Sequence, residues 1–214
     1  MNVRANETGE SENNPEPAVS ILDAVVCVHF AGANLVDVLL RALDFAGWQI
    51  HVPHEVCEEV KGKDLKFPGL RRRWAAVERS PRINVLPELT LISSDPDLID
   101  RFSEIRDSDF ESAHEQRQHL GECVVVAHGS YLAERGRTVY VGMDDRDGQR
   151  MAARYGLDCF TVEDVMHYAV HADCFPDLAA LKATWDRLRK FGDGLPPFDQ
   201  TELPDTWQEY RSGG

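Results

Sequence analysis

Acidic side chains interrupt or directly follow two apolar runs of the sequence. Asp23 lies inside the apolar run 20–27, and the pair Asp144 and Asp145 follows the apolar run 138–143. An ionised carboxylate among apolar side chains is costly unless a cation or a polar partner neutralises it. Two adjacent acids also repel each other unless a cation is near. These positions therefore suggest a site for a divalent cation.

Two further acids complete the set, although each also has a simpler structural explanation. Glu122 begins an apolar helix, where the helix dipole favours a negative side chain, and Glu59 fits a solvated helix face. A lone aspartate such as Asp23 also serves as a helix cap or turn residue.

The elements that must position these acids alternate between strands and helices. Apolar runs predict strands at residues 20–27, 48–52, 83–86, 138–143 and 157–160. Periodic apolar residues predict helices at residues 35–45, 54–61, 70–78, 98–105, 108–134 (broken near Gly121), 149–155, from 161 onward and 177–190. Such alternation predicts an α/β fold with a parallel sheet. Ligands of these sheets gather beyond the carboxyl ends of the strands.

The chain is expected to form one main domain between two acidic ends. Residues 1–18 lack periodicity and predict a disordered acidic tail. The main domain is expected at 19–173, with an acidic helical segment at 88–118. A C-terminal helix is expected at 174–192, and an acidic, proline-containing tail at 193–214.

The charge of the chain is uneven. The formal net charge is −14, with 37 acidic and 23 basic residues, which at first argues against a nucleic-acid partner. Half of this charge lies in residues 88–122, which hold ten acidic and three basic residues. One concentration of basic side chains comprises Lys61, Lys63, Lys66, Arg71, Arg72 and Arg73. It could contact an RNA backbone, and it fits a solvated helix face or a dock for an acidic partner equally well.

Other function classes find little support in the sequence. The five cysteines are scattered without CxxC spacing, which is typical of reduced thiols. The polar start of the chain does not have the pattern of a signal peptide, and no stretch reaches the ~18 apolar residues of a membrane span. We therefore expect a cytoplasmic protein with no membrane contact. The chain lacks the motifs GxxxxGK[ST], GxGxxG and GxSxG, and His167 and His171 lack the HExxH context of a zinc pair.

Four stretches, in their order along the chain, resemble PIN-domain nucleases of the VapC-like class. They are ILDAVVCVHF, VPHEVCEEV, LGECVVVAHG and VYVGMDDRDGQRMAARYGLDCF, between about residues 20 and 170. The resemblance implies a three-layer α/β/α sandwich with a central parallel sheet, to which this chain adds a C-terminal helix. It also implies an acidic pocket that binds Mg²⁺ or Mn²⁺ and hydrolyses RNA.

The resemblance assigns roles to individual acids. Asp23, Glu122 and Asp144 are the implied metal ligands and catalytic residues. Glu59 and Asp145 are implied to be catalytic as well, either as secondary ligands or by orienting water. RNA is the expected substrate, with weak candidate contacts at Arg71, Arg72 and Arg73. Because such nucleases include toxins of toxin–antitoxin pairs, an antitoxin protein and a second copy of the chain are candidate partners.

Two positions depart from the family's pattern and keep an alternative open. Ala24 and Val25 stand where a small polar residue is common, and Gly142 and Met143 lack the Thr or Ser often found before the last acid. The alternative is a catalytically inactive PIN-fold module that binds a protein or RNA partner. A phosphate-handling enzyme such as a phosphatase would need a DxD arrangement, which Asp23-Ala24-Val25 does not supply.

Overall fold

The protein is an α/β sandwich built on one parallel sheet of five strands. The computed structural model describes residues 16–115, 118–192 and 194–213. The strand order is β3-β2-β1-β4-β5, with every neighbouring pair parallel. The strands are β1 (Val19–Leu22), β2 (Gln49–Pro53), β3 (Ile83–Leu86), β4 (Val139–Gly142) and β5 (Asp158–Phe160). The predicted fold class is therefore confirmed.

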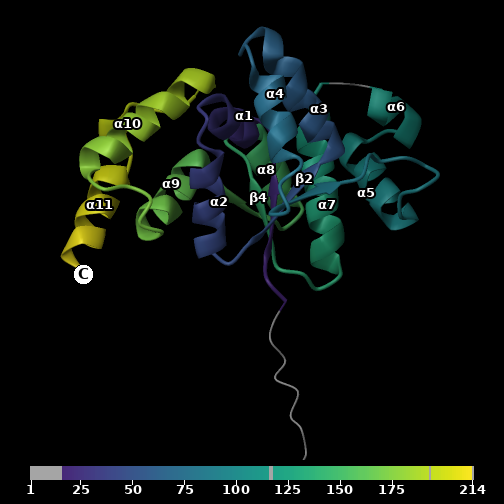
Figure 1. Ribbon diagram of the computed structural model, residues 1–214. Helices are drawn as coiled ribbons and strands as arrows, with labels where there is room; N and C mark the ends of the chain where they lie inside the picture. The colour runs from purple at the N-terminus through teal and green to yellow at the C-terminus, as the bar shows by residue number, and fades with distance from the viewer. Residues whose placement is uncertain (1–15, 116–117, 193, 214) are drawn as a thin grey trace, which may run out of the picture.

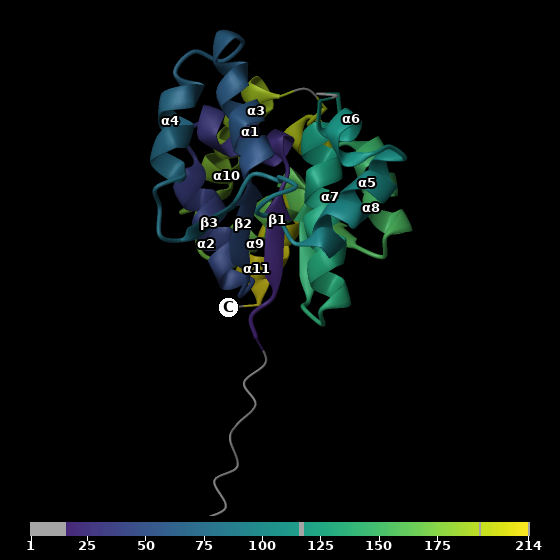
Figure 2. The same cartoon turned by 90° about the vertical axis from the view of Figure 1, so that its right-hand side faces the viewer.

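Helices cover both faces of the sheet (Figure 1 and Figure 2). They are α1 (Ala24–Gly32), α2 (Val36–Phe45), α3 (His54–Gly62), α4 (Leu70–Val77), α5 (Pro96–Arg106), α6 (Phe110–Glu115), α7 (Leu120–Glu134), α8 (Arg146–Arg154), α9 (Val162–His171), α10 (Leu178–Leu188) and α11 (Leu203–Ser212). Three short 3₁₀ helices are η1 (Lys63–Leu65), η2 (Arg189–Phe191) and η3 (Phe198–Gln200). Helix α7 packs on one face, and α2 pairs with α9 on the other. Among the described residues, none of these helices has the length and apolar character needed to cross a membrane.

The first strand is shorter than the sequence predicts. β1 ends at Leu22, and Asp23 is the N-cap of α1, so the prediction of one strand through Cys27 is wrong. Helix α1 is buried along almost its whole length, and it carries apolar residues on every side. A helix without a polar face shows no period of 3.6, and its sequence cannot be distinguished from a buried strand.

The acidic segment 88–118 contributes a second, smaller core. Leu98, Ile99 and Phe102 of α5 are buried against α7, as their spacing predicts. The predicted helix at 108–134 is divided into α6 and α7, and the backbone of His119 takes the left-handed conformation (φ 57°) just before α7. The acids of α5 and α6, such as Asp100 and Glu111, therefore lie on helices that extend the outer layer beside α7.

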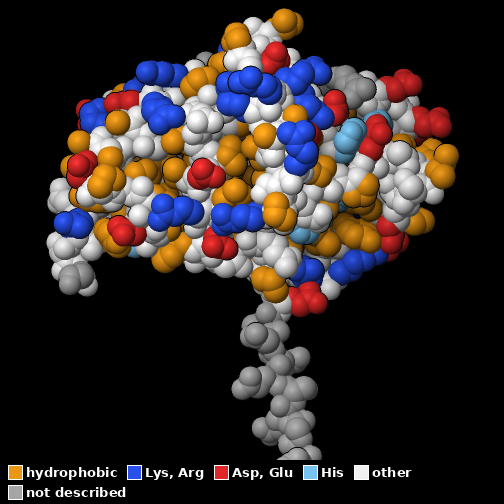
Figure 3. Space-filling model, in the orientation of Figure 1, with side chains coloured by type: hydrophobic (Ala, Val, Ile, Leu, Met, Phe, Trp, Pro, Cys, Tyr) orange, Lys and Arg blue, Asp and Glu red, His pale blue; other side chains and the backbone are white. Residues whose placement is uncertain are grey.

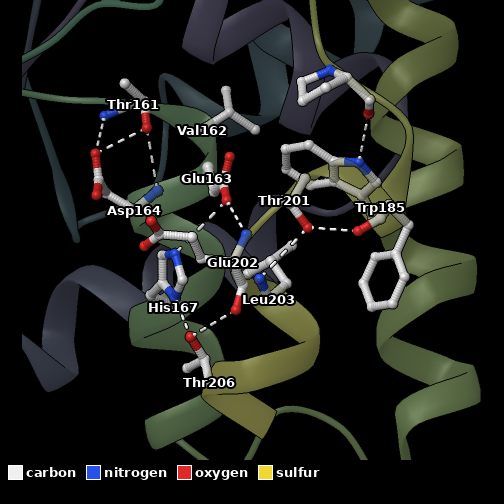
Figure 4. Close-up of polar contacts among 12 residues, drawn as sticks. Thr161, Val162, Glu163, Asp164, His167, Trp185, Thr201, Glu202, Leu203 and Thr206 are labelled. Carbon is white, nitrogen blue, oxygen red and sulfur yellow. Dashed lines mark hydrogen bonds and ion pairs between the residues drawn. The ribbon is translucent and has the colours of Figure 1, made fainter.

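The chain beyond residue 192 folds onto the domain, which corrects the expectation of a tail there. Leu203 is fully buried, and Phe198 and Trp207 also join the main core. Figure 4 shows how this segment is fixed to α9: the Thr206 hydroxyl lies 2.7 Å from His167 Nδ1. The amide of Glu202 donates to a side-chain oxygen of α9 at 2.7 Å. The predicted tail at residues 1–18 falls mostly outside the described residues.

Replacing Leu203 by alanine tests whether the C-terminal segment is part of the fold. Loss of a fully buried leucine side chain leaves a cavity, so Leu203→Ala should lower the free energy of unfolding by about 2–5 kcal/mol in urea titrations. The matched control is Leu65→Ala, because Leu65 is 98% exposed and its loss should cost less than about 0.5 kcal/mol. Equal small effects of the two substitutions would show that the segment is a tail.

Candidate active site

Asp23 lies at the carboxyl end of β1, the central strand, and its side chain is almost out of contact with water. The residue is 3% exposed. Burial raises the pKa of Asp23 to about 7, against the lowering effect of the Ala24 amide. The negative charges of Glu59 and Glu122 raise this pKa further. Two other acids predicted from the sequence are therefore close enough to act on Asp23.

Glu59, on α3, faces both the interior of the site and the surface. A Cβ atom built on Gly121 would lie 2.8 Å from Glu59 Oε2 and 3.4 Å from Asp23 Oδ1. The missing side chain at Gly121 thus leaves a small space on α7 against both acids. The other oxygen, Glu59 Oε1, forms an ion pair with Lys63 Nζ at 2.8 Å.

Glu122 and Asp145 continue this acidic edge. Burial raises the pKa of Glu122, His119 opposes this effect, and the charges of Asp145 and Glu59 add to it. His119 Nδ1 lies 3.0 Å from Glu122 Oε2. A Cβ atom on Gly148 would lie 3.7 Å from Glu122 Cγ and 3.8 Å from Asp145 Oδ2. These contacts link the four acids: Asp23 directly after β1, Glu59 on α3, Glu122 on α7 and Asp145 at the N-cap of α8. Glu59 and Asp145 lie at the exposed side of this group.

Asp145 combines its place in this group with a role in the fold. It is the N-cap of α8, and its Oδ2 accepts hydrogen bonds from the amides of Asp147 and Gly148 at 2.9 Å each. Helix α8 consequently begins at Arg146, three residues before the start that the apolar pattern predicts. Asp145 therefore caps α8 through one of its two carboxylate oxygens, Oδ2.

Asp144 contacts the start of α9 through its side chain. Its Oδ1 accepts a hydrogen bond from the Val162 amide at 3.2 Å, at the N-terminus of α9. Burial raises the pKa of Asp144 to about 6, and the charges of Asp164 and Glu163 also raise it. Its Oδ2 is buried and has no hydrogen-bond partner among the described residues. Of the two adjacent acids, Asp145 is the one that lies beside Glu122.

The donor set suits a hydrated Mg²⁺ or Mn²⁺ rather than a closed metal cage. The donors are carboxylate oxygens, and their raised pKa values at Asp23 and Glu122 reflect negative charge that burial leaves poorly compensated. In the part of the chain that the structure describes, no group of three or more His, Cys, Asp or Glu side chains is arranged to hold a metal ion. Mg²⁺ is commonly bound through one or two carboxylates, with waters and substrate phosphates completing its shell. The residues present fit that mode of binding.

Basic side chains gather next to the acids. Figure 3 shows Lys and Arg side chains over α3 and α4. Arg71 and Arg72 are exposed and open to a ligand. Arg73 differs, because its Nε donates to the carbonyl of Ala31 at 2.8 Å and so joins α4 to the end of α1. Of the three arginines predicted to contact RNA, two are therefore accessible and the third is used within the fold.

A hollow of about 780 Å³ adjoins the acidic group on the side of α8. It is bordered by His119 and Glu122, and its lining also includes Arg150, Met151 and Arg154. An open hollow with cationic side chains and an apolar floor beside acidic residues can accommodate part of an extended phosphate-containing chain.

Sequence reasoning missed Glu55, and it did not pair Lys63 or His119 with the acids. Glu55, 6% exposed, accepts a hydrogen bond from the Leu89 amide at 2.8 Å and fixes the segment after β3 to α3. No sequence signal marks it, because its partner is a backbone amide. Lys63 and His119, by contrast, stand at i+4 from Glu59 and i−3 from Glu122, spacings that bring side chains together on a helix.

Comparisons with known proteins do not assign the chain to a family. No family model matches the sequence, and no curated protein matches it.

The pKa of Asp23 predicts how the stability of the protein varies with pH. Because this pKa rises from 3.8 to about 7 on folding, the stability that the protonated side chain contributes is lost as the pH rises through that range. Asp23→Asn removes the titration. In EDTA, the variant should therefore gain stability over the wild type as the pH rises from 4 to 8, by an amount on the order of 4 kcal/mol.

Urea titrations across this pH range measure the effect, with Asp199→Asn as the exposed control. If the difference in the free energy of unfolding between Asp23→Asn and the wild type does not change with pH, the raised pKa of a buried carboxyl group at this position is contradicted.

Proposed function

We propose that this protein is a metal-dependent ribonuclease of PIN type that hydrolyses RNA phosphodiester bonds with Mg²⁺ or Mn²⁺. The observation that carries the proposal is the meeting of four acids at the carboxyl edge of the central strands. They are Asp23, Glu59, Glu122 and Asp145. They come from four separate elements, so the fold itself gathers the negative charge.

Asp23 is buried and Glu122 half-buried, and burial raises the pKa of both, whereas Glu59 and Asp145 are exposed beside them. Asp23 and Glu122 are the proposed ligands, and Glu59 and Asp145 are positioned to hold or orient water around the cation. When bound, Mg²⁺ or Mn²⁺ supplies a Lewis acid that activates water and stabilises the oxygens of the scissile phosphate. Asp144, hydrogen-bonded to the Val162 amide, is proposed to support the β4–α9 junction.

The surroundings supply what the acids lack for binding RNA. The exposed guanidinium groups of Arg71 and Arg72 can contact phosphates. The hollow beside Glu122 offers space for a nucleotide next to the acids. The acidic helices α5 and α6 are expected to repel phosphates, which would confine RNA to the basic edge.

One observation favours a second candidate function. Ala24 and Met143, which flank Asp23 and the last pair of acids, are both 1% exposed and apolar. No hydroxyl group stands at these two positions to hold a metal-bound water. A catalytically inactive module that binds RNA or a protein through the same edge therefore remains the alternative.

Replacing single aspartates by asparagine should distinguish the nuclease from the catalytically inactive module. With Mn²⁺, the wild type should cleave single-stranded RNA, and Asp23→Asn or Asp145→Asn should slow cleavage by roughly 100-fold or more, because each removes charge that holds the cation. Asn is a good N-cap, so Asp145→Asn should keep α8 intact.

The matched control is Asp144→Asn, which should retain most activity. RNA cleavage is followed on denaturing gels with a labelled oligonucleotide. If the wild type binds RNA but never cleaves it in Mn²⁺ or Mg²⁺, the inactive module is the correct description. If Asp144→Asn is inactive while Asp145→Asn is active, the assignment of these neighbours must be reversed.

A methyl group at Gly121 should close the space between the acids. In Gly121→Ala the new Cβ would meet Glu59 Oε2 at 2.8 Å and displace it. Because alanine is a better helix former than glycine, we expect a fold of similar stability but Mn²⁺ affinity lower by about tenfold. Calorimetric titration with Mn²⁺ measures this. Gly62→Ala, where a Cβ meets nothing within 4 Å, should leave the affinity unchanged. Equal affinities in both variants would place the cation elsewhere.

A further inference from the structure

Lys63 is the point at which the acidic group meets the basic surface. It follows α3 directly and begins η1, which contacts both α3 and α4. Its Nζ lies 2.8 Å from Glu59 Oε1, and both side chains are partly exposed, at 33% and 43%. The other oxygen of the same carboxylate faces Gly121 and Asp23. One carboxylate is therefore shared between the interior of the site and a cation at the surface.

A divalent cation in the acidic group and the ammonium group of Lys63 would compete for the carboxylate of Glu59. A divalent cation in the acidic group attracts Glu59 more strongly than a single, hydrated ammonium group does. When the charge of Glu59 is drawn inward, the ion pair with Lys63 weakens. The flexible stem of lysine then lets the ammonium group turn to another anion at the same edge.

We propose that Lys63 is a substrate-positioning residue, which holds Glu59 in the metal-free protein and binds an RNA phosphate beside the site once a divalent cation is present. This inference rests on the proposed nuclease function. Arg71 and Arg72 are exposed cations on α4, which η1 contacts. A phosphate backbone that runs over α4 would thus reach Lys63 as its last cationic contact before the acids.

The neighbouring lysine provides a matched control. Lys61 stands two residues earlier, on α3, and pairs with Glu58 and Glu78, at 3.1 Å from the latter. These partners lie outside the acidic group. A role for Lys63 that depended only on positive charge in this region would be shared by Lys61.

The test compares two binding reactions in one set of variants. Calorimetric titration gives the affinity for Mn²⁺, and fluorescence anisotropy at 4 °C in Mn²⁺ gives the affinity for a labelled 12-nucleotide single-stranded RNA, with its integrity checked on a gel. In Lys63→Met we expect Mn²⁺ to bind about threefold more tightly, because a competing cation is gone. We expect RNA to bind about fivefold more weakly, because a phosphate contact is lost.

Opposite changes in the two affinities would support the inference, as would near-wild-type values in Lys63→Arg and in Lys61→Met. Weakening of both affinities together, with a lower melting temperature, would show a structural role and overturn it. Unchanged RNA affinity with normal Mn²⁺ binding would also overturn it, while leaving the proposed nuclease function intact. Absence of Mn²⁺ binding to the wild type would instead refute the proposed function itself.

Discussion

The structure buries one carboxyl group, that of Asp23, at the carboxyl edge of a parallel sheet and surrounds it with other acids. Asp23 ends the central strand with 3% of its surface exposed, and the charges of Glu59 and Glu122 act on it. Such an arrangement lowers the stability of the folded protein. Proteins commonly retain such a cost where it serves function. Gly121 on α7 makes space for it, and Lys63 offsets part of the charge.

Much of the fold could be predicted from the sequence, because most helices and strands show a clear spacing of apolar residues or a clear residue at which they begin or end. Strand β3, for example, has the predicted bounds Ile83–Leu86. Prediction failed where burial removed the period, as in α1, whose apolar residues looked like a continuation of β1. It also failed at the C-terminus, where the polar and proline-containing composition concealed Leu203 and Trp207, an i, i+4 pair that buries one face of α11.

The candidate site was only partly predictable for a different reason. Strand ends mark acids that the topology gathers, so Asp23 and the final acidic pair could be found without coordinates. The direction in which each side chain points could not be predicted from the sequence. Asp144 and Asp145 are adjacent and identical in type, yet one caps α8 while the other bonds to the N-terminus of α9. Their difference arises from neighbouring helices, which only the folded chain brings into place.

The most direct test of the account is proton release on Mn²⁺ binding, measured by calorimetry at pH 6 in buffers of different ionisation enthalpy. Burial raises the pKa of Asp23 to about 7, so this carboxyl is mostly protonated at pH 6 in the metal-free protein. A cation bound by Asp23 must displace that proton. We predict release of about one proton at pH 6 and almost none at pH 8.5. Mn²⁺ binding with no proton release at pH 6, or no binding at all, would contradict a cation site at Asp23.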